Sequence, residues 1–166
     1  MRNLEAIELD ILNCDGSCRD LNFAEEITLN GVVQVLDFIS SGWALKRATD
    51  DEGKELKLEQ IHSALLREKG GLSTVWEGNV KITSLQVYIF WEAREKFFFE
   101  LTFFPDDLEK TMFKLDDFLL MVSNLVRAAG SREYYLRYEN ASWRHGSIDR
   151  DSGVIFSHHD VALPSG

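Results

Sequence analysis

The feature that most constrains the fold is a pair of runs rich in aromatic and β-branched residues, 80–91 and 97–104. Residues of these types favour strands, and the short charged stretch 92–96 between the runs predicts a β-hairpin. In the second run both alternating faces are apolar, because Phe98 and Phe104 oppose the odd-numbered positions. We therefore expect helices to cover one side of this strand and another part of the chain to cover the other.

Three segments place apolar residues at the spacing of one helix face. They are residues 31–40, a segment with the stripe Leu58, Ile61, Leu65 and Leu66 that stops at Gly70-Gly71, and residues 115–129. The last is the clearest, since Asp116 and Asp117 favour the positive end of a helix and Gly130 follows its final turn. Thr28 or Asn30 is expected to cap the first.

Five further segments have the pattern of strands. The strict alternation of Ile7, Leu9 and Ile11 with acidic residues predicts a half-buried strand over residues 4–12, ended by a turn at 13–17. The other four predicted strands are residues 21–23, 43–48, 133–140 and 153–157.

This order of elements lacks a regular alternation of strand and helix, which indicates an α+β protein. We expect a mainly antiparallel sheet with three helices packed on it as a single layer over one face. A chain of 166 residues is the usual size of one domain, so residues 1–166 are predicted to form a single globular domain.

The charge is strongly acidic, with 28 Asp and Glu against 18 Lys and Arg and a net charge of -10. Such a chain repels phosphate backbones and anionic lipids, so neither nucleic acid nor a membrane is an expected partner. A protein with a basic surface fits better. Apolar runs fall short of the roughly 20 residues that cross a bilayer, and the start of the chain lacks the pattern of a signal peptide, so a cytoplasmic location is expected.

The two cysteines, Cys14 and Cys18, have the wrong spacing for a Cys-x-x-Cys redox or zinc site. His158 and His159 add two further possible ligands, but neighbouring side chains on an extended segment point in opposite directions. We therefore expect reduced thiols, no metal site and no cofactor.

Motifs that would identify an enzyme are missing from the sequence, including the nucleophile elbow, the phosphate-binding loops and His-Glu-x-x-His. Adjacent carboxylates such as Asp106-Asp107 are expected to be solvated. No catalytic residue is therefore predicted. The alternative that stays open is a small hydrolase or transferase using His145, His158 or Glu139 in a pocket at the edge of the sheet.

The segment 133–143 combines the residue types that dominate binding energy at protein interfaces. As a strand it places four side chains on one face, which we interpret as a recognition surface. The candidate partner-binding residues are Glu133, Tyr135, Arg137, Glu139, Trp143, Asp106 and Asp107. A half-buried sheet face with cross-strand ion pairs is the equally weighted alternative for this strand.

Four stretches together resemble the small bacterial immunity proteins that neutralise polymorphic or contact-dependent toxins. They are Arg-Asp-Leu-Asn-Phe at 19–23, Glu-Leu-Thr-Phe-Phe-Pro at 100–105, Arg-Tyr-Glu-Asn-Ala-Ser-Trp at 137–143 and Ser-Gly-Val-Ile-Phe-Ser-His at 152–158. The resemblance implies a cytoplasmic, non-enzymatic inhibitor that binds a cognate toxin domain, often a nuclease, and blocks its active site. A toxin with a basic surface would agree with the negative charge of this chain.

Overall fold

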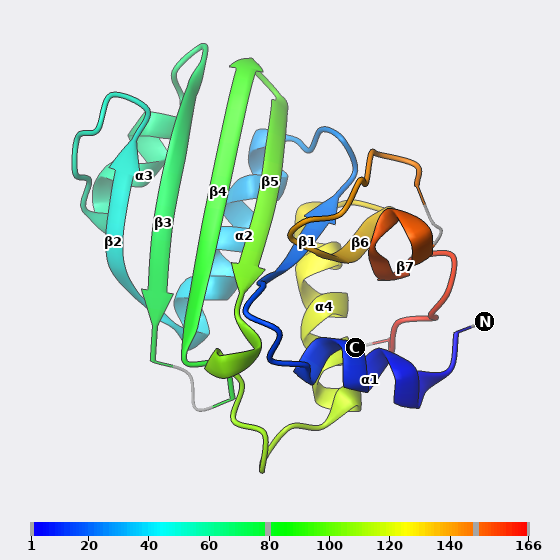
Figure 1. Cartoon of the computed structure of the whole chain (residues 1–166). Coiled ribbons are helices and arrows are strands. Elements are labelled where there is room, and N and C mark those ends of the chain that lie inside the picture. The colour runs from blue at the N-terminus through cyan, green and yellow to red at the C-terminus, as the bar shows by residue number, and fades with distance from the viewer. Residues whose placement is uncertain (1, 79–80, 148–149, 166) are drawn as a thin grey trace.

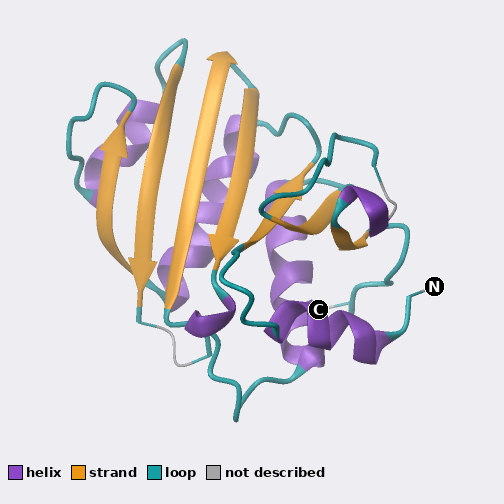
Figure 2. Cartoon of the chain, viewed as in Figure 1, coloured by secondary structure: helices purple, strands orange, loops and turns teal. Residues whose placement is uncertain are grey.

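The computed structural model describes residues 2–78, 81–147 and 150–165. Its strands form one seven-stranded antiparallel sheet in the order β2-β3-β4-β5-β1-β6-β7 (Figure 1, Figure 2). The strands are β1 (Arg19–Phe23), β2 (Ala44–Asp50), β3 (Gly70–Glu77), β4 (Ser84–Ala93), β5 (Lys96–Phe103), β6 (Tyr134–Tyr138) and β7 (Val154–Ser157). The predicted α+β class with an antiparallel sheet is confirmed.

The described residues contain four α-helices, one more than the sequence patterns predict. They are α1 (Leu4–Leu12), α2 (Leu29–Gly42), α3 (Leu58–Leu65) and α4 (Leu115–Ala129), with short 3-10 turns η1 (Pro105–Asp107) and η2 (Arg150–Ser152). Helices α2 and α4 pack against each other behind the sheet in Figure 1. Helix α1 lies elsewhere, against β7 and η1, so a single layer of three helices does not describe the arrangement.

Helix α1 replaces the strand that alternation predicts over residues 4–12. Ile7 and Ile11 are four residues apart, so one helix face buries both, while Leu9 is left 70% exposed. The Asn3 side chain accepts a hydrogen bond from the Glu5 N–H at 3.0 Å and caps the helix. Ile7 and Ile11 satisfy both a period of two and a spacing of four, which is why the pattern was ambiguous.

The predicted hairpin is present as β4 and β5, with Phe90 and Phe98 as cross-strand partners. Val80, at the start of the predicted first arm, lies outside the described residues. The other side of β5, which carries Phe98, was expected to be covered as well, but it is not. Phe98 remains half-buried, and Phe104, just after the strand, is exposed. The prediction that both sides of this strand are buried is therefore wrong.

Strand β3 begins at Gly70, where the sequence indicated only the end of a helix. Strand β4 places the Trp91 ring directly over this glycine: a Cβ there would lie 2.7 Å from the ring. The Trp91 indole also donates a hydrogen bond to the Arg67 carbonyl at 3.0 Å. Gly70 therefore serves the close packing of β3 under Trp91 as well as the end of the preceding turn.

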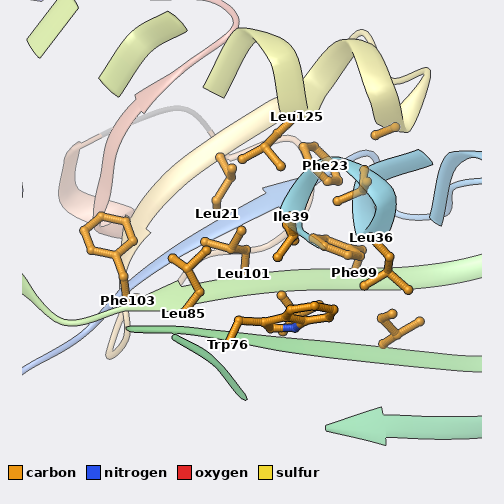
Figure 3. Packing of buried hydrophobic residues seen from close by; sticks show 14 of the residues in the cluster. Leu21, Phe23, Leu36, Ile39, Trp76, Leu85, Phe99, Leu101, Phe103 and Leu125 are labelled. Carbon is orange, nitrogen blue, oxygen red and sulfur yellow. The ribbon is translucent and has the colours of Figure 1, made fainter. Parts of the chain in front are cut away.

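The hydrophobic core lies between the sheet and the helix pair α2 and α4 (Figure 3). Phe23 of β1 stacks on Phe99 of β5 with ring centroids 5.2 Å apart, and Ile39 and Leu125 reach them from α2 and α4. Each such side chain contributes about 1.5 to 3 kcal/mol on burial. The core thus joins the first and last thirds of the chain to the central hairpin.

The two main helices were correctly predicted, and their ends follow from identifiable residues. Thr28 caps α2 by accepting from the Gly31 N–H at 3.1 Å. Gly130 ends α4 with a φ of 65°, a conformation that glycine adopts without strain. Gly31 also lets the helices approach closely, since a Cβ there would lie 2.5 Å from the Ala129 carbonyl oxygen. Within the described ranges, none of the helices has the length and apolarity to cross a bilayer.

Candidate binding surface

The sheet face turned away from α2 and α4, here called the open face, carries the candidate site. Strands β2 to β5 present it toward the viewer in Figure 1. Cross-strand partners form one row over the whole sheet: Thr49, Ser73, Tyr88, Glu100, Asn22, Tyr135 and Ser157. A second row contains Arg47, Val75, Gln86, Thr102, Asp20 and Arg137. These rows place polar and aromatic groups from distant parts of the chain side by side.

Three aromatic side chains gather on β4 and β5, and we call them the aromatic patch: Tyr88, Phe90 and Phe98. Tyr88 is 42% exposed and Phe90 is 41% exposed, while Phe98 is half-buried between them. The Tyr88 and Phe98 rings meet edge to face at 6.4 Å. Glu100, the cross-strand partner of Tyr88, lies on the same face, and Glu92 is exposed at the irregularity in pairing between Trp91 and Ala93. Adjacent exposed aromatic rings on a rigid sheet are typical of an interaction surface.

Beside the aromatic patch lies a polar cluster made by Asp20, Asn22, Glu100, Thr102 and Arg137. The Arg137 guanidinium joins it together: it donates to Glu100 Oε2 at 2.6 Å and to Asn22 Oδ1 at 2.9 Å, and it lies 3.2 Å from Asp20 Oδ2. The Thr102 hydroxyl donates to the other Asp20 oxygen at 2.6 Å. Strands β1, β5 and β6 thus each supply a polar or charged side chain that compensates the burial of a charge on a neighbouring strand.

Burial is the largest cause of the pKa shifts of Cys18 and Asp20, near the start of β1. It raises the pKa of the Asp20 carboxyl, although the Thr102 hydrogen bond and the Arg137 charge act in the opposite direction. Burial also raises the pKa of the neighbouring Cys18 thiol to about 12, with Asp20 and Glu139 adding to the effect. Cys18 is therefore a neutral, weakly nucleophilic thiol at physiological pH.

Residues 139–147, here called the strap, fold back over the open face of β6, where Figure 1 shows them in front of the strand. The Trp143 ring lies 5.0 Å from the Arg137 guanidinium and 5.2 Å from the Tyr135 ring. The Gly146 N–H donates to the Tyr135 hydroxyl at 3.3 Å. The His145 ring contacts the Trp143 ring in a tilted arrangement, with centroids 4.6 Å apart. The strap therefore closes β6, while the open face of β2 to β5 stays uncovered.

The structure divides the sequence-predicted binding residues into two groups. Tyr135, Arg137 and Trp143 come together under or within the strap, and the first two are only 1% and 9% exposed. The expectation that they form an exposed row is wrong, and cross-strand ion pairing describes Arg137 correctly. Glu133 and Glu139 are exposed just before and after β6.

Asp106 and Asp107 lie apart from this group, in η1 after β5. Asp106 accepts a hydrogen bond from the Cys14 thiol at 2.9 Å. Asp107 accepts from the Phe104 N–H at 3.3 Å, and partial burial raises its pKa. The expectation that adjacent carboxylates are simply solvated therefore fits Asp106, which is exposed, better than Asp107.

Two of the histidines considered for chemistry, His158 and His159, lie in a turn with ring centroids 4.0 Å apart, so the expectation that their side chains point in opposite directions is wrong. Nδ1 of His158 lies 3.3 Å from the Tyr134 carbonyl oxygen, and burial lowers the pKa of His145, whose ring nitrogens have no hydrogen-bond partner among the described residues. Cys14 is exposed beside Lys110, whereas Cys18 is buried directly before β1. In the part of the chain that the structure describes, no cluster of three or more His, Cys, Asp or Glu side chains could hold a metal ion.

Sequence reasoning missed the aromatic patch and the polar cluster. A signal for both exists in the strands themselves: Asp20 and Asn22 alternate with buried apolar residues in β1, and Tyr88 and Phe90 alternate with the core residues of β4. Alternation assigns such residues to the second face of a sheet. Comparison with known proteins adds no identification, since no family model, curated protein or solved structure matches this chain.

Proposed function

We propose that this chain is a non-enzymatic protein that binds a basic protein partner through the open face of β2 to β5. The observation that carries the proposal is the aromatic patch, which stands exposed on uncovered strands of a chain with a net charge of -10. A cognate toxin domain, such as a nuclease, is the partner we propose on the strength of the resemblance to bacterial immunity proteins. Inhibition would follow from covering the toxin's active site.

The aromatic patch can supply much of the binding energy. Tyr88 and Phe90 keep about two fifths of their surface in water, so a partner that covers them gains the apolar burial that folding leaves unused. Their backbone is fixed by pairing on both sides, β4 with β3 and with β5. A rigid platform loses little conformational entropy on binding, which favours affinity.

Acidic groups near and beyond the aromatic patch would guide the approach of a basic partner. Glu92 follows the patch on β4, and Glu133, Glu139 and Asp106 are exposed elsewhere on the surface. A nuclease must keep a positive groove to hold phosphates, so carboxylates at these positions would be attracted to it. Such charges mainly raise the rate of association.

The arrangement of the histidines supports binding over the enzymatic alternative. His158 faces the backbone of Tyr134, and the His145 ring contacts Trp143 of the strap and the edge of the Tyr135 ring on β6. A general base needs a geometry that presents its free nitrogen to a substrate. Neither imidazole is held by a carboxylate in the described part of the chain, so the hydrolase or transferase hypothesis gains no specific support.

The proposal can be tested with the protein encoded beside this gene as the toxin candidate. Co-expression should restore growth, and the two purified proteins should form a complex. The double variant Tyr88→Ala, Phe90→Ala should weaken the complex about 30-fold or more, the effect of losing about 2 kcal/mol of interface contact. The matched control is Leu9→Ala on α1, which removes another exposed apolar side chain and should leave binding unchanged.

Salt separates the electrostatic part of this proposal from the apolar part. Raising the salt concentration from about 50 mM to about 300 mM should slow association steeply and change dissociation little. Glu92→Lys should slow association at low salt. A complex that is indifferent to the aromatic double variant, or a lack of both protection and complex, would contradict the proposed surface and function.

A further inference from the structure

A second feature lies on the helix side of the molecule, on elements that do not form the open face. It is an apolar pocket of about 290 Å³ between the end of α2, the first half of α4 and the loop 108–114, and we call it the helix pocket. Its lining includes the buried side chains of Trp43, Ile82, Leu108 and Phe118. This volume is close to the lower limit of small-molecule sites, about 300 Å³.

Hydrogen bonds hold the walls of the helix pocket in place. The Trp43 indole donates to the Ile82 carbonyl at 2.8 Å, which ties the end of α2 to the segment before β4. Ile82 in turn pairs with Leu108 in an antiparallel bridge, flanked by a hydrogen bond from the Glu109 N–H to the Lys81 carbonyl at 3.1 Å. A ligand would therefore enter a site that is already formed, without having to order its walls.

Several apolar lining residues of the helix pocket reach solvent. Met112 is 51% exposed, Leu120 is also exposed, and Phe38 and Met121 are half-buried. These side chains come from three different elements but border one pocket, so a bound apolar group would cover all of them. Methionine side chains adapt their shape to a ligand, which suits a site for a flexible apolar chain.

The charge at the helix pocket differs in sign from that of the whole chain. Its lining contains Lys81 and Lys114 but only one carboxylate, Asp117, which lies 2.7 Å from the Lys81 ammonium. Lys114 is exposed, and no carboxylate lies within 4 Å of its ammonium among the described residues. The hydrogen bond from Lys81 is the main cause that lowers the pKa of Asp117, and the Lys114 charge adds to it from a longer distance. An anionic group placed at this rim would find in Lys114 a cation that has no direct ion pair among the described residues.

From these observations we propose that the helix pocket binds a small carboxylate amphiphile, with its apolar chain inside and its carboxylate at Lys114. At about 30 Å³ for each water-sized group, the pocket accommodates a chain of about ten non-hydrogen atoms. This inference is independent of the proposed partner binding, because it uses a different side of the sheet and different residues.

Decanoate is the probe for the first experiment, followed by calorimetry below its micelle-forming concentration. We expect saturable one-to-one binding that weakens about tenfold or more in Lys114→Glu, where attraction becomes repulsion. The matched control Lys54→Glu changes an exposed lysine in the turn after β2 and should bind as the original protein does. Decanol, with the same chain but no charge, should bind equally to the original protein and to Lys114→Glu.

A second variant tests the apolar part of the site. Met112→Glu puts a charge among the exposed lining residues, where folding tolerates it, and should weaken both decanoate and decanol about tenfold. Leu66→Glu, at an exposed leucine remote from the lining, is its control. NMR signals of the Met112 and Met121 methyl groups should shift in proportion to saturation. Absence of saturable binding, or equal binding by Met112→Glu and the original protein, would overturn the proposal.

Discussion

Both faces of β4 and β5 carry aromatic residues, but the environments of these residues are opposite. Toward the helices, Ile89 and Phe99 are cross-strand partners and almost fully buried. At the next paired position, Phe90 and Phe98 are also partners, yet Phe90 remains 41% exposed. The comparison teaches that an aromatic residue in a strand need not belong to the core. What decides its role is whether another element covers that face.

The largest expected effect separates these two faces in one pair of variants. Phe99→Ala should lower the free energy of unfolding by about 3 to 5 kcal/mol, because it leaves a cavity beside Phe23 in the core. Phe90→Ala removes the same ring from the open face and should cost less than about 1 kcal/mol. Urea unfolding of both variants measures the difference. Equal losses would mean that the open face is covered in solution.

The next largest effect on stability concerns the polar cluster around Arg137, where the strap covers the sheet. Arg137→Met keeps the length of the side chain but leaves the partly buried carboxylates of Asp20 and Glu100 without their cation. We expect a loss of about 3 kcal/mol in the free energy of unfolding. Arg47→Met, on the exposed strand β2 of the same face, is the control and should change stability by less than about 0.5 kcal/mol. A small effect at Arg137 would show that the polar cluster is more hydrated than its contacts indicate.

A smaller effect on stability tests how closely α2 and α4 pack, through a substitution of Gly31. Gly31→Ala should cost about 1 to 3 kcal/mol, because the new methyl group must displace the Ala129 carbonyl and separate α2 from α4. On β3, a Cβ at Gly71 would make only ordinary contacts, with Asp51 Cβ at 3.4 Å. Thermal unfolding should therefore distinguish Gly31→Ala from Gly71→Ala. If both are tolerated equally, the two helices pack less closely than described.

The smallest effect is the response of the strap to pH. Burial lowers the pKa of His145 in the folded protein, so the unfolded chain binds a proton first as the pH falls through about 6.5. Stability due to His145 is therefore present above that pH and decreases below it. Unfolding between about pH 7 and about pH 5.5 should show a shallower decline in His145→Phe than in the original protein. An identical pH dependence in both would place His145 in contact with water.

Sequence patterns predicted those elements whose residues satisfy only one periodicity. Helix α4 has a stripe that no strand can bury, and the hairpin has runs too rich in β-branched and aromatic residues for a helix. The failures have the opposite cause. Ile7 and Ile11 fit either a strand or a helix, and Gly70 fits either the stop of a helix or the close packing under Trp91.

The candidate site was predictable only in part, because exposure depends on elements distant in sequence. Alternation correctly placed Tyr135 and Arg137 on one face of β6. It could not show that the strap returns over that face and buries them. The strap is held there by the contact of Trp143 with Arg137 and by the hydrogen bond from Gly146 to Tyr135, which alternation within β6 does not reveal. Conversely, alternation in β4 assigns Tyr88 and Phe90 to the second face of the sheet, but it does not tell whether another element covers that face.

The interior position of β1, between β5 and β6, has a consequence for the order of events during synthesis. The Asn22 side chain bonds to Glu100 and to Arg137, which follow it by 78 and 115 residues. At about 5 to 20 residues per second, a ribosome needs on the order of ten seconds to deliver both neighbouring strands after β1 has emerged. Until then β1 has two unpaired edges, each able to pair with another nascent chain. Asp20 and Asn22 alternate with the apolar residues of β1. These two polar side chains would keep the unpaired strand soluble during that interval.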